Sequence, residues 1–197
     1  AIITYLFNII MMQLVGEHGV AAITILLYGQ FLFNAFYLGF TIGISPIVGF
    51  QYGARDKQKL RNIYHTSFLF VAVSSVFMAV IAIVLSPTIV TIFTDDPATY
   101  ELAAAGFRLF AINFLFSGIS ITSSGFFTAL SNGTISAVIS FCRTLGFIVL
   151  SLLILPKFLG ITGAWIAIPV AEFCTLLVTG VMHFVYFWKP GIRNYLR

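Results

Sequence analysis

The sequence predicts an all-α membrane protein, a bundle of six transmembrane helices in which the first helix is truncated. Three observations predict this fold class. Hydrophobic residues make up 60% of the 197-residue chain and charged residues only 8%, whereas an ordinary soluble domain is about 25% charged. The mean hydropathy is +1.06. The apolar residues form runs long enough to span a bilayer, and the basic residues gather at the ends of these runs.

Each expected span is an apolar run between polar breaks. The first run ends before Glu17 and is too short for a complete span, so we interpret it as the later part of a helix. Ser86–Pro87 is expected to end the third helix, and turns are expected at residues 94–97 and 131–134. Pro156 is expected to end the fifth helix. The expected spans are residues 1–16, 20–50, 66–86, 100–129, 135–155 and 162–187.

A basic loop orients the bundle. Arg55, Lys57, Lys59 and Arg61 follow a charge-free stretch and are expected to anchor the chain at the cytoplasmic surface, because Lys and Arg are retained on that side of a membrane. Strict alternation of six spans then predicts a cytoplasmic C-terminus. It places Glu17, Asp95, Asp96, Glu101 and Lys157 outside, and Lys189, Arg193 and Arg197 inside.

The stretch before this loop is rich in glycine. Gly39, Gly43, Pro46, Gly49 and Gly53 form two GxxxG motifs around a proline. Small residues at this spacing allow helices to approach closely. We therefore expect these residues to mark tight helix packing where the helix leaves the membrane.

Three ionisable residues lie inside the expected spans. Arg108 lies nearer the outside and is expected to snorkel or to pair with Glu101. The other two, Arg143 and Glu172, lie deeper. Each is about ten residues from the start of its span, and at about 1.5 Å per residue both lie near the middle of the bilayer. Because the fifth and sixth helices are antiparallel neighbours, an ion pair between the two residues is feasible. Such a pair either locks the two helices together or forms a cation- or proton-coupling site in the bundle core.

Four uncharged polar residues also lie inside the spans. Gln30 and Asn34 are four residues apart, so they share one helical face. Amide side chains in a bilayer either hydrogen-bond between helices or line a path for a polar substrate. The candidates are Asn8, Gln30, Asn34 and Asn113.

Several function classes are excluded by the motifs that the sequence lacks. It has no Walker A, GxGxxG, GxSxG or HExxH pattern. We therefore expect neither an enzyme nor a bound metal or organic cofactor. The basic residues lie at segment ends rather than on one face interleaved with aromatics, so a nucleic-acid partner is not expected.

Five stretches occur in a fixed order along nearly the whole chain. They are VGEHGVAAI at 15–23, GISPIVGFQYGA at 43–54, GFFTALSNG at 125–133, SFCRT at 140–144 and GAWIAIPVAE at 163–172. Together they resemble the C-terminal six-helix lobe of bacterial multidrug and toxic compound extrusion (MATE) transporters.

The resemblance implies one lobe of a twelve-helix exporter in the bacterial inner membrane. Such transporters expel cationic, amphipathic compounds in exchange for H⁺ or Na⁺ by alternating access between two lobes. The implied partners are therefore the lipid bilayer, the N-terminal six-helix lobe of the same protein and cationic drug-like substrates.

The resemblance also bears on the coupling ion. Sodium-coupled members carry a carboxylate in the region that corresponds to Ser117–Ser120, and this chain has no acid there. That difference favours H⁺ over Na⁺. One alternative is a flippase of the same superfamily for lipid-linked sugars or peptidoglycan precursors, which would carry more basic residues in its central cavity. A second alternative is a membrane scaffold without transport activity.

Overall fold

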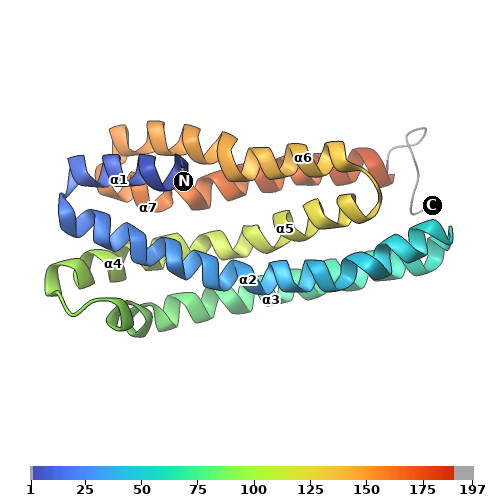
Figure 1. The fold of residues 1–197 in the computed structure, drawn as a ribbon, viewed down its shortest axis with the longest axis horizontal. Coiled ribbons are helices and arrows are strands. Elements are labelled where there is room, and N and C mark those ends of the chain that lie inside the picture. Colours follow the sequence, from blue (N-terminus) through green and yellow to red (C-terminus); the bar gives the residue numbers. More distant parts are fainter. Residues whose placement is uncertain (1, 189–197) are drawn as a thin grey trace.

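The chain folds into long helices that run along one common axis (Figure 1). The computed structural model describes residues 2–188, so Lys189, Arg193 and Arg197 lie outside the described residues. The elements are α1 (Ile2–Leu14), α2 (Glu17–Gly53), α3 (Lys57–Phe93), α4 (Pro97–Phe110), the 3₁₀ turn η1 (Ala111–Asn113), α5 (Phe114–Ala129), α6 (Gly133–Phe141), the π-helical turn η2 (Cys142–Gly146), α7 (Phe147–His183) and the π-helical turn η3 (Phe184–Trp188).

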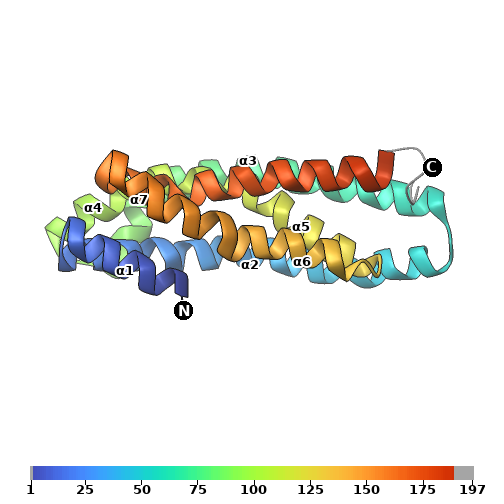
Figure 2. The ribbon, with the colours of Figure 1, turned by 90° about the horizontal axis from the view of Figure 1, so that it is seen from above.

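The described elements make five passes along the bundle, and the short α1 adds a partial sixth. Four helical stretches are long and apolar enough to span a membrane, and the last of them covers Gly133–Phe187. This last stretch reverses at Gly160, where φ is 57° and ψ is −134°. From above, the orange half of the stretch runs to one end of the bundle and the red half returns (Figure 2). The predicted all-α six-helix bundle is therefore confirmed, while the span boundaries stay a prediction.

Short polar side chains begin three of the helices. Asp56 accepts a hydrogen bond from the Lys59 backbone N–H at 3.0 Å, and Asp96 accepts one from the Thr99 N–H at 2.9 Å. Asn132 caps α6 through the Ile135 N–H. Each side chain satisfies a backbone donor that the first helical turn leaves unpaired. The turns expected at residues 94–97 and 131–134 are thus present.

The sequence predicts that the third helix ends at Ser86–Pro87, and this prediction is wrong. α3 continues through Pro87 to Phe93. Proline removes the N–H that would bond the carbonyl of Ile83, but the Ser86 hydroxyl donates to that same carbonyl at 2.9 Å. Pro156 likewise lies inside α7 rather than ending the fifth pass, which continues to the reversal at Gly160.

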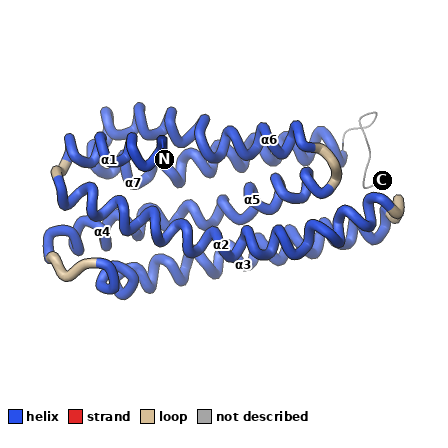
Figure 3. Tube along the Cα trace, viewed as in Figure 1, coloured by secondary structure: helices blue, strands red, loops and turns tan. Residues whose placement is uncertain are grey.

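The connecting segments gather at the two ends of the bundle (Figure 3). One end, here the basic end, holds the Ala54–Asp56 turn, with Arg55, Lys57, Lys59 and Arg61 around it, and the Ser131–Asn132 turn. The opposite end, here the acidic end, holds Gly16, the Thr94–Asp96 segment and Gly160. The separation of charge that the sequence predicts is therefore present, and its orientation across the membrane stays a prediction.

A polar contact joins two helices at the acidic end. His18 Nδ1 of α2 lies 2.9 Å from Asp96 Oδ2 and 3.2 Å from Thr99 Oγ1. Hydrogen bonds from Thr99, with a smaller contribution from His18, lower the pKa of Asp96 below its usual value. A carboxyl with a lowered pKa stabilises the fold while it is ionised, and this contribution is lost as the pH falls through the lowered value.

The α4–η1–α5 pass is the central helix of the bundle. Half of the most apolar stretch of Pro97–Ala129 is buried, against 17–28% in the other three long stretches. Phe107, Phe110 and Phe114 are fully buried in a cluster with residues of α1, α2, α3 and α7. Phe126 and Phe127 belong to a second cluster toward the basic end, together with Phe187. Other passes therefore contact this helix along its whole length.

Close helix contacts occur at glycines other than the expected ones. A Cβ atom added at Gly39, Gly43 or Gly53 would meet no atom within 4 Å, and at Gly49 only the Ala129 carbonyl at 3.6 Å. The expectation of tight packing at these glycines is thus not met among the described residues. α2 continues as a helix through Pro46. Gly39, Gly43 and Gly53 are exposed on this helix, so no neighbouring helix of the described chain packs against them.

The central helix instead supplies a close contact at Gly118. A Cβ there would lie 2.5 Å from Tyr37 Cε1 and 2.7 Å from Ser75 Oγ. We predict that Gly118→Ala lowers the stability of the bundle by roughly 1–3 kcal/mol, the cost of overpacking. Gly39→Ala is the matched control and should not destabilise, since its Cβ meets open space. Thermal unfolding in detergent measures both, and equal midpoints for the two variants would contradict this packing.

Candidate functional site

The structure brings Arg143 and Glu172 together. Arg143 lies in η2 and Glu172 in the returning arm of α7, and Arg143 Nε donates to Glu172 Oε1 at 3.0 Å. The bond joins the two arms on either side of the Gly160 reversal. A π-helical turn shifts the side-chain register of a helix and often occurs at functional sites.

The two partners differ in burial. The Glu172 side chain is 1% exposed and the Arg143 side chain 19% exposed. Glu172 Oε1 is occupied by the guanidinium, but its Oε2 has no hydrogen-bond partner among the described residues. A buried carboxylate is costly unless its charge is compensated, so Arg143 makes the burial of Glu172 tolerable. The carboxylate still has one free oxygen that can accept a proton.

A cavity of ≈ 210 Å³ adjoins Arg143. Its wall is formed by α2, α5, α6 and η2. Figure 1 shows α5 running between α2 and α6. At this point α2 and α5 approach closely, because a Cβ at Gly125 would overlap the Thr41 methyl group. The lining residues are Leu38, Thr41, Ile42, Ser120, Ile121, Ser124, Gly125, Ser140 and Arg143.

Hydroxyl groups join α5 to α6 beside this cavity. Ser124 Oγ lies 2.8 Å from Ser140 Oγ and 2.9 Å from Ser136 Oγ. Thr128 Oγ1 donates to Ser136 Oγ at 2.7 Å. These direct bonds hold the hairpin that carries Arg143, since interhelical hydroxyl bonds stabilise helix pairs in membranes.

The four predicted amide residues do not line this cavity. Asn113 is fully buried, and its Nδ2 donates to the Phe110 carbonyl of its own helix at 2.6 Å. Asn34 is buried, while Gln30 and Asn8 are half-buried. The amide oxygens of Asn8, Asn34 and Asn113 have no partner among the described residues. Whether these residues join helices or line a substrate path stays open.

The structure also contains a polar cluster at the basic end that we did not predict from the sequence. Tyr64 of α3 lies 3.0 Å from His183 Nδ1, and His183 Nε2 lies 2.9 Å from Ser123 Oγ of α5. The rings of Phe68, Phe127 and Phe187 contact the imidazole. These partners come from three separate passes, so no local spacing in the sequence reveals the cluster.

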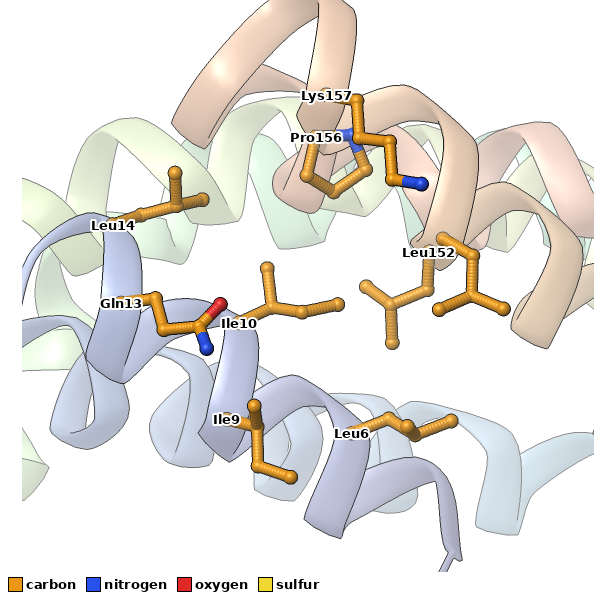
Figure 4. A pocket seen from close by; sticks show the side chains of 9 residues that line it. Leu6, Ile9, Ile10, Gln13, Leu14, Leu152, Pro156 and Lys157 are labelled. Atoms are coloured by element: carbon orange, nitrogen blue, oxygen red, sulfur yellow. The ribbon is translucent and has the colours of Figure 1, made fainter.

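A second cavity lies between α1 and the outgoing arm of α7 (Figure 4). It has a volume of ≈ 380 Å³ and is lined mainly by aliphatic side chains, with the polar groups of Gln13 and Lys157 at its edge. It includes neither member of the ion pair. Across the part of the chain that the structure describes, no cluster of three His, Cys, Asp or Glu side chains is arranged to hold a metal ion.

Comparison with known proteins identifies the family. The model of the MatE family matches residues 1–153, well over half of the chain. The chain belongs to the MatE family. The match includes Arg143 and ends before Glu172.

Curated relatives of this MatE chain include multidrug and toxin extrusion protein 1 of Homo sapiens and of Pongo abelii. Each is 27% identical over 143 residues, which cover 70% of this chain and 24% of the relative. The chain thus spans about a quarter of the length of these relatives.

Solved structures show the same fold. A MATE family multidrug resistance transporter of the MOP superfamily, in an outward-facing conformation, superimposes with a TM-score of 0.84 at 20% identity, covering 92% of this chain and 41% of the other. A MOP superfamily transporter from Pyrococcus furiosus gives a TM-score of 0.84 at 19% identity over the same shares. The predicted MATE-type lobe is therefore confirmed as a fold and as a family.

The ion pair of this MatE lobe leads to a stability prediction. Arg143→Met leaves the Glu172 charge uncompensated in the interior and should destabilise by roughly 3–5 kcal/mol at neutral pH. Glu172→Gln should cost less, because the stranded Arg143 is 19% exposed. The double variant should recover much of the loss. Thermal unfolding of the four proteins tests this cycle, and additive effects of the two substitutions would contradict a direct pair.

Proposed function

We propose that this lobe is part of a secondary active multidrug antiporter. The complete protein would export cationic, amphipathic compounds in exchange for H⁺ by alternating access, with the N-terminal lobe forming the other wall of the substrate path. It would lie in the inner membrane of a bacterial cell, with its C-terminus in the cytoplasm. Membership of the MatE family supports transport, and the name of the human relative, which describes multidrug and toxin extrusion, supports the substrate class.

The observation that carries the proposal is the buried ion pair beside a cavity. With Glu172 ionised, the pair has no net charge, so a cationic compound near Arg143 meets little repulsion. A proton on Glu172 leaves the Arg143 charge uncompensated, and at low dielectric an unpaired charge repels another cation strongly. Binding of a proton and binding of a cationic substrate therefore disfavour each other at this site, and coupled exchange requires this competition.

The local chemistry favours H⁺ over Na⁺ as the coupling ion. Sodium binds to several oxygen ligands, and a guanidinium that already occupies one carboxylate oxygen both competes with the ion and repels it. The described wall of the Arg143 cavity adds hydroxyl groups but no second carboxylate.

A flippase for a pyrophosphate-linked substrate fits this lobe less well. Such a substrate needs uncompensated basic groups, because phosphate recognition relies on Arg or Lys charges that are free to pair with it. Here the charge of Arg143 is already matched by Glu172. A scaffold without transport activity gives no reason to keep a costly ion pair in the bundle core.

The full-length protein in vesicles with imposed gradients tests the proposal. We expect an inward proton gradient to drive export of a cationic dye, and Glu172→Gln to abolish that dependence, because the amide cannot take up the proton. Glu17→Gln is the matched control, since Glu17 is exposed at the acidic end.

Two results would contradict this proposal. Absence of dye movement under both proton and sodium gradients would refute export of cationic compounds. Normal efflux and normal pH dependence in Glu172→Gln would refute the coupling role of this residue and leave the ion pair a structural lock.

A further inference from the structure

A buried polar seam runs between the central helix and the returning arm of α7. Three contacts set the register of the two helices: a Cβ at Gly106 would lie 2.7 Å from Trp165, the rings of Phe116 and Phe173 lie 5.5 Å apart, and Ser123 meets His183 at 2.9 Å. All three join residues at a similar separation along the chain, so the two helices run parallel from the acidic to the basic end.

Polar residues recur along this contact on both helices. On α7, Trp165, Glu172 and Thr179 follow each other at intervals of seven, so they share one face of the helix. His183 continues that face four residues later. The polar residues of this face are Glu172, Thr179 and His183, which are 1%, 1% and 8% exposed.

The central helix carries buried polar groups at the same levels. Asn113 and Ser123 are each 0% exposed. Ser120 and Ser124 line the cavity beside Arg143, and Ser117, seven residues before Ser124, lies on the same face as Ser124. Ser123 already bonds His183. In the register set by the three contacts above, the seam extends from the level of Glu172 and Asn113 to the His183 cluster at the basic end.

Several oxygens in this seam lack a partner. Asn113 Oδ1, Thr179 Oγ1 and Glu172 Oε2 form no hydrogen bond to any described residue. An unsatisfied buried polar group costs about 1–3 kcal/mol, and buried water that bonds two to four such groups is the usual ligand. The hydroxyls on the α6 side of the central helix differ, because Ser124 bonds Ser136 and Ser140 directly.

We propose that the α5–α7 seam holds a file of water molecules that carries protons between Glu172 and His183. The two residues are eleven positions apart in sequence, or about 16 Å along the helix. Thr179 provides a hydroxyl within this interval, and Tyr64 connects His183 to half-buried surface near the basic loop. This inference rests on the proposed function and adds the route by which Glu172 would reach the basic end.

The proton balance of this route is simple. Each water or hydroxyl accepts a proton on one side and releases another on the opposite side, so O–H bonds form and break in equal number. His183 accepts a proton at one ring nitrogen and releases one from the other, which exchanges its tautomers without net charge. The carboxylate of Glu172 gains the proton, while Arg143 keeps its own.

The titratable groups that face this route come from three elements. Glu172 and His183 are on α7, Arg143 is on η2 and Tyr64 is on α3. Tyr37 on α2 approaches the central helix from the other side, where its hydroxyl donates to the Phe114 carbonyl at 3.3 Å.

Water in the seam can be tested without measuring transport. In full-length protein with Cys142 and Cys174 replaced by Ala, Thr179→Cys should react with the small neutral reagent methyl methanethiosulfonate at least about tenfold faster than Ala167→Cys, because thiolate formation needs water. Ala167 is the dry control, since it is fully buried in the apolar cluster on the same helix. Equal, slow labelling of both variants would overturn the proposal.

The role in proton movement requires a second comparison. Thr179→Val keeps the side-chain shape and removes an unpartnered hydroxyl, so it should slow proton-driven efflux several-fold with little change in dye affinity. Thr175→Val is the matched control, because Thr175 Oγ1 already donates to the Ala171 carbonyl at 2.8 Å. Wild-type rates in Thr179→Val would overturn proton conduction. If the wild-type protein shows no efflux under either gradient, the proposed antiporter function is refuted. The labelling test would still show whether the seam contains water.

Discussion

A carboxylate and a guanidinium remain inside an apolar bundle only while each compensates the charge of the other, and here they lie on the two arms that meet at Gly160. The bond between Arg143 and Glu172 therefore sets the position of the fifth pass relative to the sixth along the bundle axis. The π-helical turn at Cys142–Gly146 carries Arg143, and the Ser124–Ser136–Ser140 hydroxyls hold that segment against the central helix. Helix packing around the site is thus constrained by the need to keep one buried charge paired.

Each face of the central helix contacts a different neighbouring helix. Gly118 admits Tyr37 of α2, Ser123 bonds His183 of α7, and Ser124 bonds the serines of α6. Small side chains at these positions allow close approach and provide short hydroxyl bonds, which replace the hydrophobic driving force that is missing between helices in lipid. Because these side chains are small, there is also room for a hydroxyl-lined cavity next to Arg143.

Much of this arrangement follows from local features of the sequence. Apolar runs predict the six passes, Asx side chains before α4 and α6 predict the turns, and equal depth from opposite sides makes a pair between Arg143 and Glu172 feasible. What the sequence does not reveal depends on partners distant in the chain. His183, for example, has its partners 119 and 60 residues away. The continuation of α3 through Pro87 depends instead on a local bond, from the Ser86 hydroxyl to the carbonyl that Pro87 leaves unpaired, and the proline alone does not predict this bond. The glycines of α2 fit a packing motif, but no helix of the described chain covers Gly39, Gly43 or Gly53.

The central claim is that Glu172 changes its protonation state while Arg143 does not. Infrared difference spectroscopy of the full-length protein between alkaline and acidic pH measures this directly, because a protonated carboxyl group has its own carbonyl stretch. The account predicts that this band appears on acidification, is absent in Glu172→Gln, and grows when a bound cationic compound is removed. A Glu172 carboxylate that stays ionised throughout the pH range over which efflux varies would contradict it, and the pair would then be a structural lock.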